Sequence, residues 1–121
     1  MYAETDFILA LLKEDDWLSD RAEKIYNKEK DSLWTSSHTV MELMLIAYRE
    51  DLNVLKVVSE TIELLEIRGN FKHMESAATY IEEEDITPFD ALHLVKSRGE
   101  KIVSSDKTFD SYNERLKLEE D

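Results

Sequence analysis

Apolar and polar positions follow the period of an α-helix over most of the chain. Residues 17–30 and 71–84 carry apolar side chains at helical spacing between charges, and residues 88–95 are apolar on almost every side, which is typical of a covered helix. Only two glycines and one proline interrupt the chain, so helices should dominate. The segments that we predict as helical, the first of them at a strand-to-helix transition, are 7–12, 17–30, 36–47, 51–60, 71–84 and 87–98.

Short apolar segments between these helices fit strands. They lie near residues 1–4, 33–36, 62–67, 101–104 and 116–118, and the third of them also fits a helix end. Strands that alternate with helices indicate parallel βαβ units. We therefore predict an α/β fold, a three-layer α/β/α sandwich with a mainly parallel sheet of roughly five strands.

The start of the last predicted helix contains a functional candidate. Thr87 suits the N-cap and Pro88 the first helical position, where no backbone N–H is needed. Asp90 then lies in the first turn of a helix that is otherwise apolar. Either Asp90 completes a capping-box-like exchange with Thr87 and complements the helix dipole, or it has a function.

Composition limits the class of protein. The length of 121 residues suits one domain, residues 1–121. Cysteine is absent, which excludes disulfides, a thiolate nucleophile and a Cys-based zinc site and fits a reducing cytosol. No basic region of a signal peptide is visible, and each apolar run is far shorter than the ~20 residues that span a bilayer. We expect a soluble, cytoplasmic protein without a membrane segment.

The chain is strongly acidic. Its formal net charge is −13, from 28 Asp and Glu against 15 Lys and Arg. This charge argues against an ordinary basic nucleic-acid-binding surface. Two readings stay open together: the acids are mostly solvated helix faces, or some of them converge on a cation-binding site.

Acidic side chains follow two of the predicted strands. Glu4 and Asp6 come after the first strand, and Ser104 and Asp106 end the fourth. Ligands of open α/β sheets bind outside the carboxyl ends of the strands. Taken singly, a helix cap at Asp6 and an Asx turn at Asp106 are the simpler readings, and the coincidence of both pairs favours a site.

Glu42 is the only acid in the apolar body of its helix, and no Lys or Arg lies within a helical turn. An unpaired carboxylate is costly to bury, so we favour metal binding or catalysis over a distant salt bridge. His38 and Glu42 share a helix face, as do Asp90 and His93, so a zinc site is a formal alternative. A structural histidine is the commoner case.

Four acidic stations on separate elements resemble the PIN-domain family over essentially the whole chain. The stations are the 4–6 turn Glu-Thr-Asp, the lone helical Glu42, the 90–93 segment Asp-Ala-Leu-His, and the 104–109 segment Ser-Ser-Asp-Lys-Thr-Phe. The family usually has Asp where this chain has Glu4 and often Asn where it has Asp6, so either of these residues is the first ligand. Asp110 is a candidate for the further acid that members often carry near the fourth station.

The resemblance implies a ribonuclease that depends on Mg²⁺ or Mn²⁺. Its implied ligands are Asp90 and Asp106 with Glu4 or Asp6, and Glu42 would bind the metal directly or through water. Hard divalent cations prefer such oxygen ligands, and metal-bound water can attack a phosphate near neutral pH.

The resemblance also implies a role for Ser104, which would orient an acid or the phosphate. The implied partners are an RNA substrate and, for a VapC-like toxin of a VapBC-type pair, a VapB-like antitoxin. A homodimer is also implied, with the faces around Trp17 and Leu18 or around Leu52 and Leu55 as its expected surfaces.

Two other classes compete with a nuclease. The first is a catalytically weak or inactive PIN-like scaffold that binds RNA or a protein partner, which the acidic charge and Glu4 favour. The second is a helical interaction protein in which Glu42 is salt-bridged and the four acidic stations lie apart. The geometry of the carboxylates distinguishes these classes.

Overall fold

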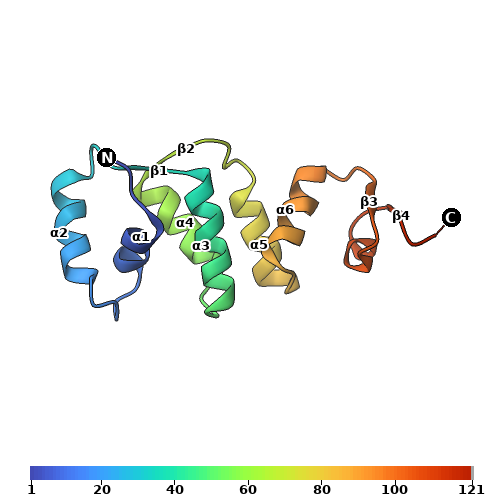
Figure 1. The fold of residues 1–121 in the computed structure, drawn as a ribbon, viewed down its shortest axis with the longest axis horizontal. Helices are drawn as coiled ribbons and strands as arrows, with labels where there is room; N and C mark the ends of the chain where they lie inside the picture. Colours follow the sequence, from blue (N-terminus) through green and yellow to red (C-terminus); the bar gives the residue numbers. More distant parts are fainter. Residues whose placement is uncertain (121) are drawn as a thin grey trace.

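Helices form most of the computed structural model, which describes residues 1–120 (Figure 1). The α-helices are α1 (Thr5–Leu12), α2 (Ser19–Glu29), α3 (Ser37–Arg49), α4 (Val54–Leu64), α5 (Met74–Glu84) and α6 (Pro88–Ser97). Each overlaps a segment predicted as helical. In the described part of the chain, none of these helices is long and apolar enough to cross a membrane.

Four three-residue strands also lie where strands were predicted. They are β1 (Trp34–Ser36), β2 (Glu66–Arg68), β3 (Ile102–Ser104) and β4 (Arg115–Lys117). β1 pairs with β2 and β3 pairs with β4, both in parallel, and Tyr2 adds one parallel bridge to Trp34. The fold is therefore α/β, as predicted.

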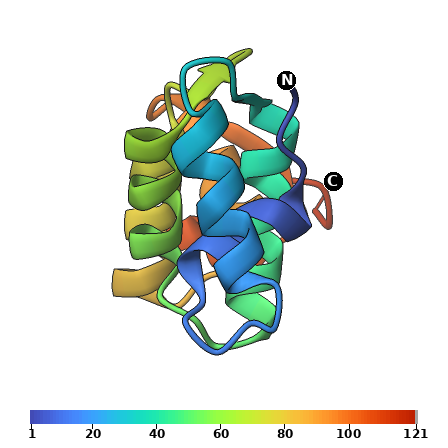
Figure 2. The same cartoon turned by 90° about the vertical axis from the view of Figure 1, so that its left-hand side faces the viewer.

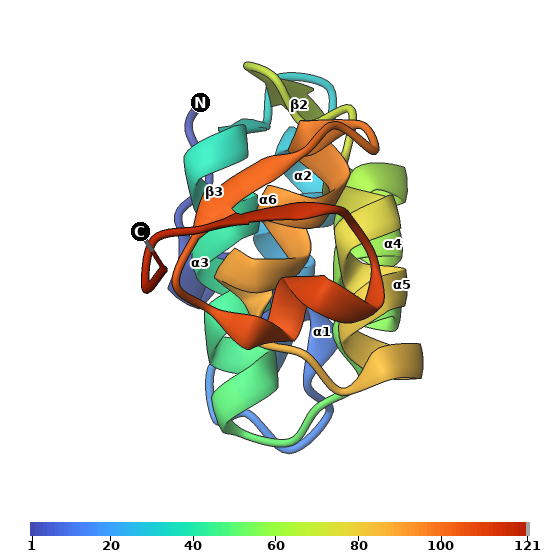
Figure 3. The ribbon, with the colours of Figure 1, turned by 90° about the vertical axis from the view of Figure 1, so that its right-hand side faces the viewer.

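The predicted single sheet of about five strands is not what residues 1–120 form. They form two separate two-stranded sheets. In Figure 1, α5 and α6 lie between these sheets, so the three-layer arrangement around one central sheet is also absent from this part of the chain. Figure 2 shows α1 and α2 at one end of the molecule, and Figure 3 shows β3 and β4 at the other.

The second sheet is separate from the first because the segment that contains it packs against α6. We call β3, β4 and the 3₁₀-helix η1 (Lys107–Ser111) between them the C-terminal unit. Phe109 of this unit is buried and meets His93 of α6 edge-on, with the ring centroids 6.3 Å apart. The Asn113 amide donates to the Ser97 hydroxyl at 3.1 Å and to the Glu100 carbonyl at 2.8 Å. These contacts fix the C-terminal unit against α6.

The apolar core is centred on α3. Val40, Leu43, Met44 and Ala47 of this helix are completely buried. They pack among apolar side chains of α1, α4, α5 and α6, because α3 touches each of these helices. Trp17, which belongs to one of the expected dimer surfaces, is 88% exposed before α2 and lies outside this core.

Two predicted helix starts differ in how they are capped. Ser36 caps α3, since its hydroxyl accepts from the Thr39 N–H at 3.4 Å. Thr87 occupies the N-cap of α6 and Pro88 follows, but the Thr87 hydroxyl makes no cap hydrogen bond. The capping-box exchange, one of the two interpretations left open for Asp90, is therefore not formed, whereas the position of Asp90 in the first turn still suits the helix dipole.

Arg115 at the start of β4 ties the C-terminal unit together. Its side chain is only 1% exposed, and its guanidinium donates to Asp110 at 2.7 Å and to Glu119 at 2.9 Å. It also donates to the Ser104 carbonyl at 2.7 Å. Hydrogen bonds from Arg115 lower the pKa of the Asp110 and Glu119 carboxyls, and the two carboxylates raise the pKa of Arg115.

We predict that Arg115→Met lowers stability in a pH-dependent way. The carboxyls have lowered pKa values in the folded chain, so their contribution is complete above the ordinary pKa of about 4 and is lost as pH falls through the folded values. Urea midpoints at pH 7 should therefore fall for the variant, and the gap to the parent should close toward pH 3. Lys117→Met, which removes the exposed pair with Glu120 and a smaller charge effect on Asp110 and Glu119, should change stability much less.

Candidate functional site

The first acidic station lies where the N-terminal segment becomes a helix. The Ala3 N–H donates to the Trp34 carbonyl at 2.8 Å, which holds this segment along β1. Glu4 is the N-cap residue of α1, and its side chain makes no cap hydrogen bond. Glu4 and Asp6 are exposed while Thr5 between them is buried. Both carboxylates are thus open to solvent at the carboxyl end of a strand segment.

Glu42 joins this station from α3. One of its carboxylate oxygens accepts from the Thr5 hydroxyl at 3.4 Å, and the other lies 2.8 Å from Nε2 of His38. The Glu42 side chain is 46% exposed, so the predicted burial of an unpaired acid is wrong. His38 one helical turn earlier is the partner, which satisfies the i,i+4 relation seen in the sequence. We call Thr5, His38 and Glu42, with Glu4 beside Thr5, the α1–α3 cluster.

Tyr2 borders this cluster and was not predicted to matter. Its hydroxyl is 2.8 Å from the Ser36 hydroxyl and 2.9 Å from the Thr39 hydroxyl. These hydrogen bonds, Ser36 first, hold the pKa of Tyr2 below its usual value, while the nearby charge of Glu42 acts in the opposite direction. Thr5 contacts Glu42 directly, whereas Tyr2 ties the N-terminal segment to the start of α3.

The fourth station is built by two local turns. The Ser104 hydroxyl accepts from the Asp106 N–H at 2.9 Å, and the Asp106 carboxylate accepts from the Thr108 N–H at 2.9 Å. The second bond is the predicted Asx turn, and it lowers the pKa of Asp106. The outer carboxylate oxygen has room for a ligand because Asp106 is only half-buried. In contrast, both carboxylate oxygens of Asp110 accept hydrogen bonds from Arg115, one from Nε and one from Nη2.

Asp90 lies apart from these groups in the first turn of α6. It is half-buried, and within residues 1–120 its carboxylate has no hydrogen bond or ion pair. His93 of the same face contacts Phe109 instead of forming a His–Asp pair. The position of Asp90 in the first turn of α6 suits the helix dipole, and its carboxylate is open to a ligand.

The predicted acids do not converge within one chain. Across the described residues, no three His, Asp or Glu side chains are grouped so that they could hold one metal ion. The structure brings Glu42 to the Glu4–Thr5 turn and leaves Asp90 and Asp106 on α6 and the C-terminal unit. Their carboxylate chemistry suits Mg²⁺ or Mn²⁺. The assignment of these residues to a metal site stays a prediction.

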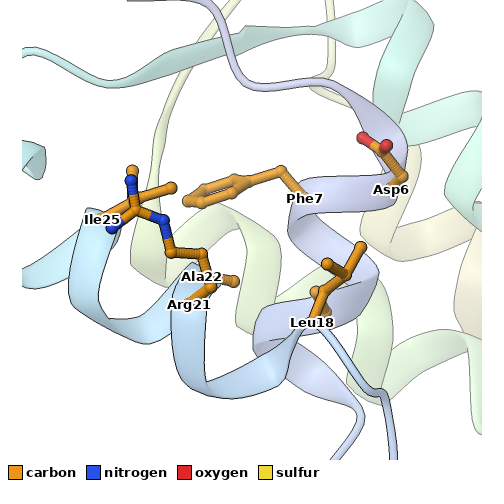
Figure 4. Close-up of a pocket in the computed structure, with 7 residues that line it drawn as sticks. Asp6, Phe7, Leu18, Arg21, Ala22 and Ile25 are labelled. Carbon is orange, nitrogen blue, oxygen red and sulfur yellow. The ribbon is translucent and has the colours of Figure 1, made fainter.

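An apolar pocket of about 170 Å³ also touches the first station (Figure 4). Figure 4 shows the Phe7 ring reaching from α1 toward Ile25 of α2, with the Asp6 carboxylate at the rim. Arg21 is the one basic residue in this lining. The pocket lies between α1 and α2, and its lining includes Asp6 but not Glu4.

A comparison with protein-family models matches the PIN domain over residues 1–115. The chain belongs to the PIN-domain family. PIN domains are generally nucleases. Searches of curated proteins and of solved structures find no match.

We predict opposite behaviour for the two acids of the C-terminal unit. Asp110→Asn should lower the urea midpoint, because it weakens the pair with buried Arg115, and should leave Mn²⁺ affinity unchanged. Asp106→Asn keeps an oxygen for the Thr108 N–H, so it should preserve stability and reduce Mn²⁺ affinity. Urea unfolding and Mn²⁺ calorimetry of both variants test this contrast. Reduced Mn²⁺ affinity in Asp110→Asn alone would contradict it.

Proposed function

We propose that this PIN-family chain is a Mg²⁺- or Mn²⁺-dependent endoribonuclease, acting as a single cytoplasmic domain of residues 1–121. The PIN match over residues 1–115 carries the proposal. It is supported by Glu4, which lies at the end of the N-terminal strand segment next to the Thr5–Glu42 hydrogen bond. The reaction is hydrolysis of an RNA phosphodiester, in which water attacks phosphorus and a ribose oxygen leaves.

The residue roles combine the family resemblance with the contacts of those side chains that have them. Glu4, Asp90 and Asp106 are proposed cation ligands, with Asp6 as the alternative to Glu4. Glu42, held by Thr5 and His38, is a further ligand. Ser104 positions Asp106 through its backbone N–H.

Partners follow from the same family assignment. We propose an RNA substrate, a VapB-like antitoxin that makes the chain a VapC-like toxin, and a homodimer. RNA must approach a chain with a net charge of −13, so cation binding and local basic residues have to offset repulsion. Arg68 is such a residue near the first station, 4.1 Å above the Trp34 ring.

A second candidate is a PIN-like scaffold that binds RNA or protein without catalysis. The observation that favours it is that, within residues 1–120, no three His, Asp or Glu side chains are grouped so that they could hold a metal ion. Calorimetry separates the two functions, because a scaffold needs no divalent cation. Absence of Mn²⁺ binding together with retained RNA binding would favour the scaffold.

We predict that Asp90→Asn and Glu42→Gln each reduce Mn²⁺-stimulated cleavage of a fluorescent single-stranded RNA by about 100-fold or more. Both positions are at least partly exposed, so unfolding free energies should stay within about 0.5 kcal/mol of the parent. Glu75→Gln, an exposed acid in the first turn of α5, is the matched control and should cleave normally. Unchanged cleavage by Asp90→Asn would refute the site.

A further inference from the structure

Two segments without acidic residues lie side by side in this otherwise acidic chain. Residues 32–41 and 67–74 contain no Asp or Glu, although the chain has 28 of them. Parallel pairing of β1 with β2 places Ser36 opposite Arg68 and so brings the two segments together. Figures 1 and 3 show β2, the N-terminus and the start of α3 on one side of the molecule. Negative charge is therefore sparser on this side than the net charge of −13 suggests.

The loop after β2 packs tightly against the start of α3. Gly69 has a φ of +106°, a conformation that glycine adopts without strain. A Cβ at this position would lie 2.6 Å from the Ser37 hydroxyl oxygen, so a larger residue would push the loop away from α3. This close approach fixes the neighbouring Arg68 beside the first turn of α3.

Arg68 supplies a positive charge on this side. Its Cζ lies 4.1 Å from the centroid of the Trp34 ring, so the guanidinium covers an aromatic face. Its Nε donates to Glu66 at 3.4 Å, but both side chains are more than half exposed, which makes this pair weak. Within residues 1–120 its two terminal nitrogens have no hydrogen-bond partner, so they can contact a phosphate. Lys72 in the following loop is a second exposed cation.

Aromatic surface lies next to this charge. Tyr2 is 47% exposed, and its ring meets that of Trp34 edge-on with the centroids 4.9 Å apart. The Tyr2 hydroxyl is held by the Ser36 and Thr39 hydroxyls at 2.8 and 2.9 Å. A ring that is held in place before a ligand arrives costs little to order on binding. Tyr2, Trp34 and Arg68 thus form a preformed surface, which we call the β1–β2 platform.

Single-stranded RNA is the ligand whose chemistry matches this platform. Unpaired bases stack on aromatic rings and on guanidinium planes, while phosphates pair with Arg and Lys. In a duplex the bases are stacked on one another and cannot lie on a protein ring. An acidic protein segment would pair with Arg68 but would not need the exposed ring of Tyr2. The combination of both groups therefore favours an unpaired RNA strand.

The β1–β2 platform is continuous with the α1–α3 cluster. Tyr2 is two residues before Glu4 in the same N-terminal segment. The hydroxyls that hold Tyr2 belong to Ser36, the N-cap of α3, and to Thr39 in its first turn, and the same helix carries Glu42. A nucleotide on the platform is therefore next to acids that we propose for catalysis.

We propose that the β1–β2 platform binds the single-stranded part of an RNA substrate, with Arg68 on a phosphate and Tyr2 stacked on an unpaired base. Lys72 adds a second phosphate contact. This assignment rests on the proposed nuclease function and deepens it, because it names RNA with unpaired bases as the substrate class. Arg68 and Tyr2 bind the substrate and do not act on the scissile bond.

Fluorescence anisotropy of a short labelled single-stranded RNA, in EDTA at low salt, tests the platform apart from any cation. Arg68→Gln should weaken binding about tenfold and reduce the salt slope by about 0.7, because one phosphate contact is lost. Tyr2→Leu should weaken binding about tenfold through lost stacking, whereas Tyr2→Phe keeps the ring and most of the affinity. Arg98→Gln changes the net charge equally at an exposed position after α6, so it is the matched control and should bind normally.

The outcomes of this binding experiment are distinct. A duplex of the same sequence should bind more weakly than the single strand and should not respond to Tyr2→Leu. No binding by the parent chain, no loss in Arg68→Gln, or an equal loss in Arg98→Gln overturns the platform. Loss in Arg68→Gln without loss in Tyr2→Leu, together with displacement of the RNA by polyglutamate, identifies an acidic protein partner and also overturns it.

Steady-state cleavage separates failure of the platform from failure of the proposed function. With Mn²⁺, Arg68→Gln should raise KM for single-stranded RNA about tenfold and leave kcat near that of the parent. Arg68→Lys keeps the charge but not the planar group, so its KM should fall between the two. Unchanged KM in Arg68→Gln, while the parent cleaves, overturns the platform alone. A parent chain that binds RNA through Arg68 and Tyr2 without cleaving it refutes the proposed nuclease and leaves the platform standing.

Discussion

Burial of α3 is the constraint on which the rest of the structure depends. Val40, Leu43, Met44 and Ala47 have no exposed surface, and α1, α4, α5 and α6 all pack against this helix. Burying each of the larger side chains contributes roughly 1.5–3 kcal/mol to the free energy of folding. This face of α3 is therefore a major source of stability. Once the buried face of α3 is packed, the position of its partly exposed face is fixed as well. Glu42 lies on that partly exposed face, where it accepts a hydrogen bond from Thr5 in the first turn of α1.

The acids are held differently from one another, which shows how the chain tolerates them. Glu42 is next to His38, Asp106 accepts a backbone N–H, and Asp110 and Glu119 share one buried guanidinium. Each of these carboxylates therefore has a nearby group that compensates its charge. Glu4 and Asp90 have none within residues 1–120, and both lie at the starts of helices, where the dipole favours negative charge.

Much of the secondary structure could be predicted from the sequence, because helical periodicity and short apolar runs are local signals. Strands were expected at residues 33–36 and 101–104, and β1 and β3 lie there. The pairing of strands could not be predicted, since it depends on contacts of Phe109 and Asn113 with α6 that leave no local pattern.

The candidate site was predictable in part for the same reason. The pairing of His38 with Glu42 follows from helical spacing, and the Asx turn of Asp106 follows from its position after a strand. The solvent exposure of Glu42 was missed, because an apolar helix with one acid looks the same in sequence whether that acid is buried or at the rim. The buried pairing of Arg115 was also missed, since its two carboxylates become neighbours only when β4 folds back along β3.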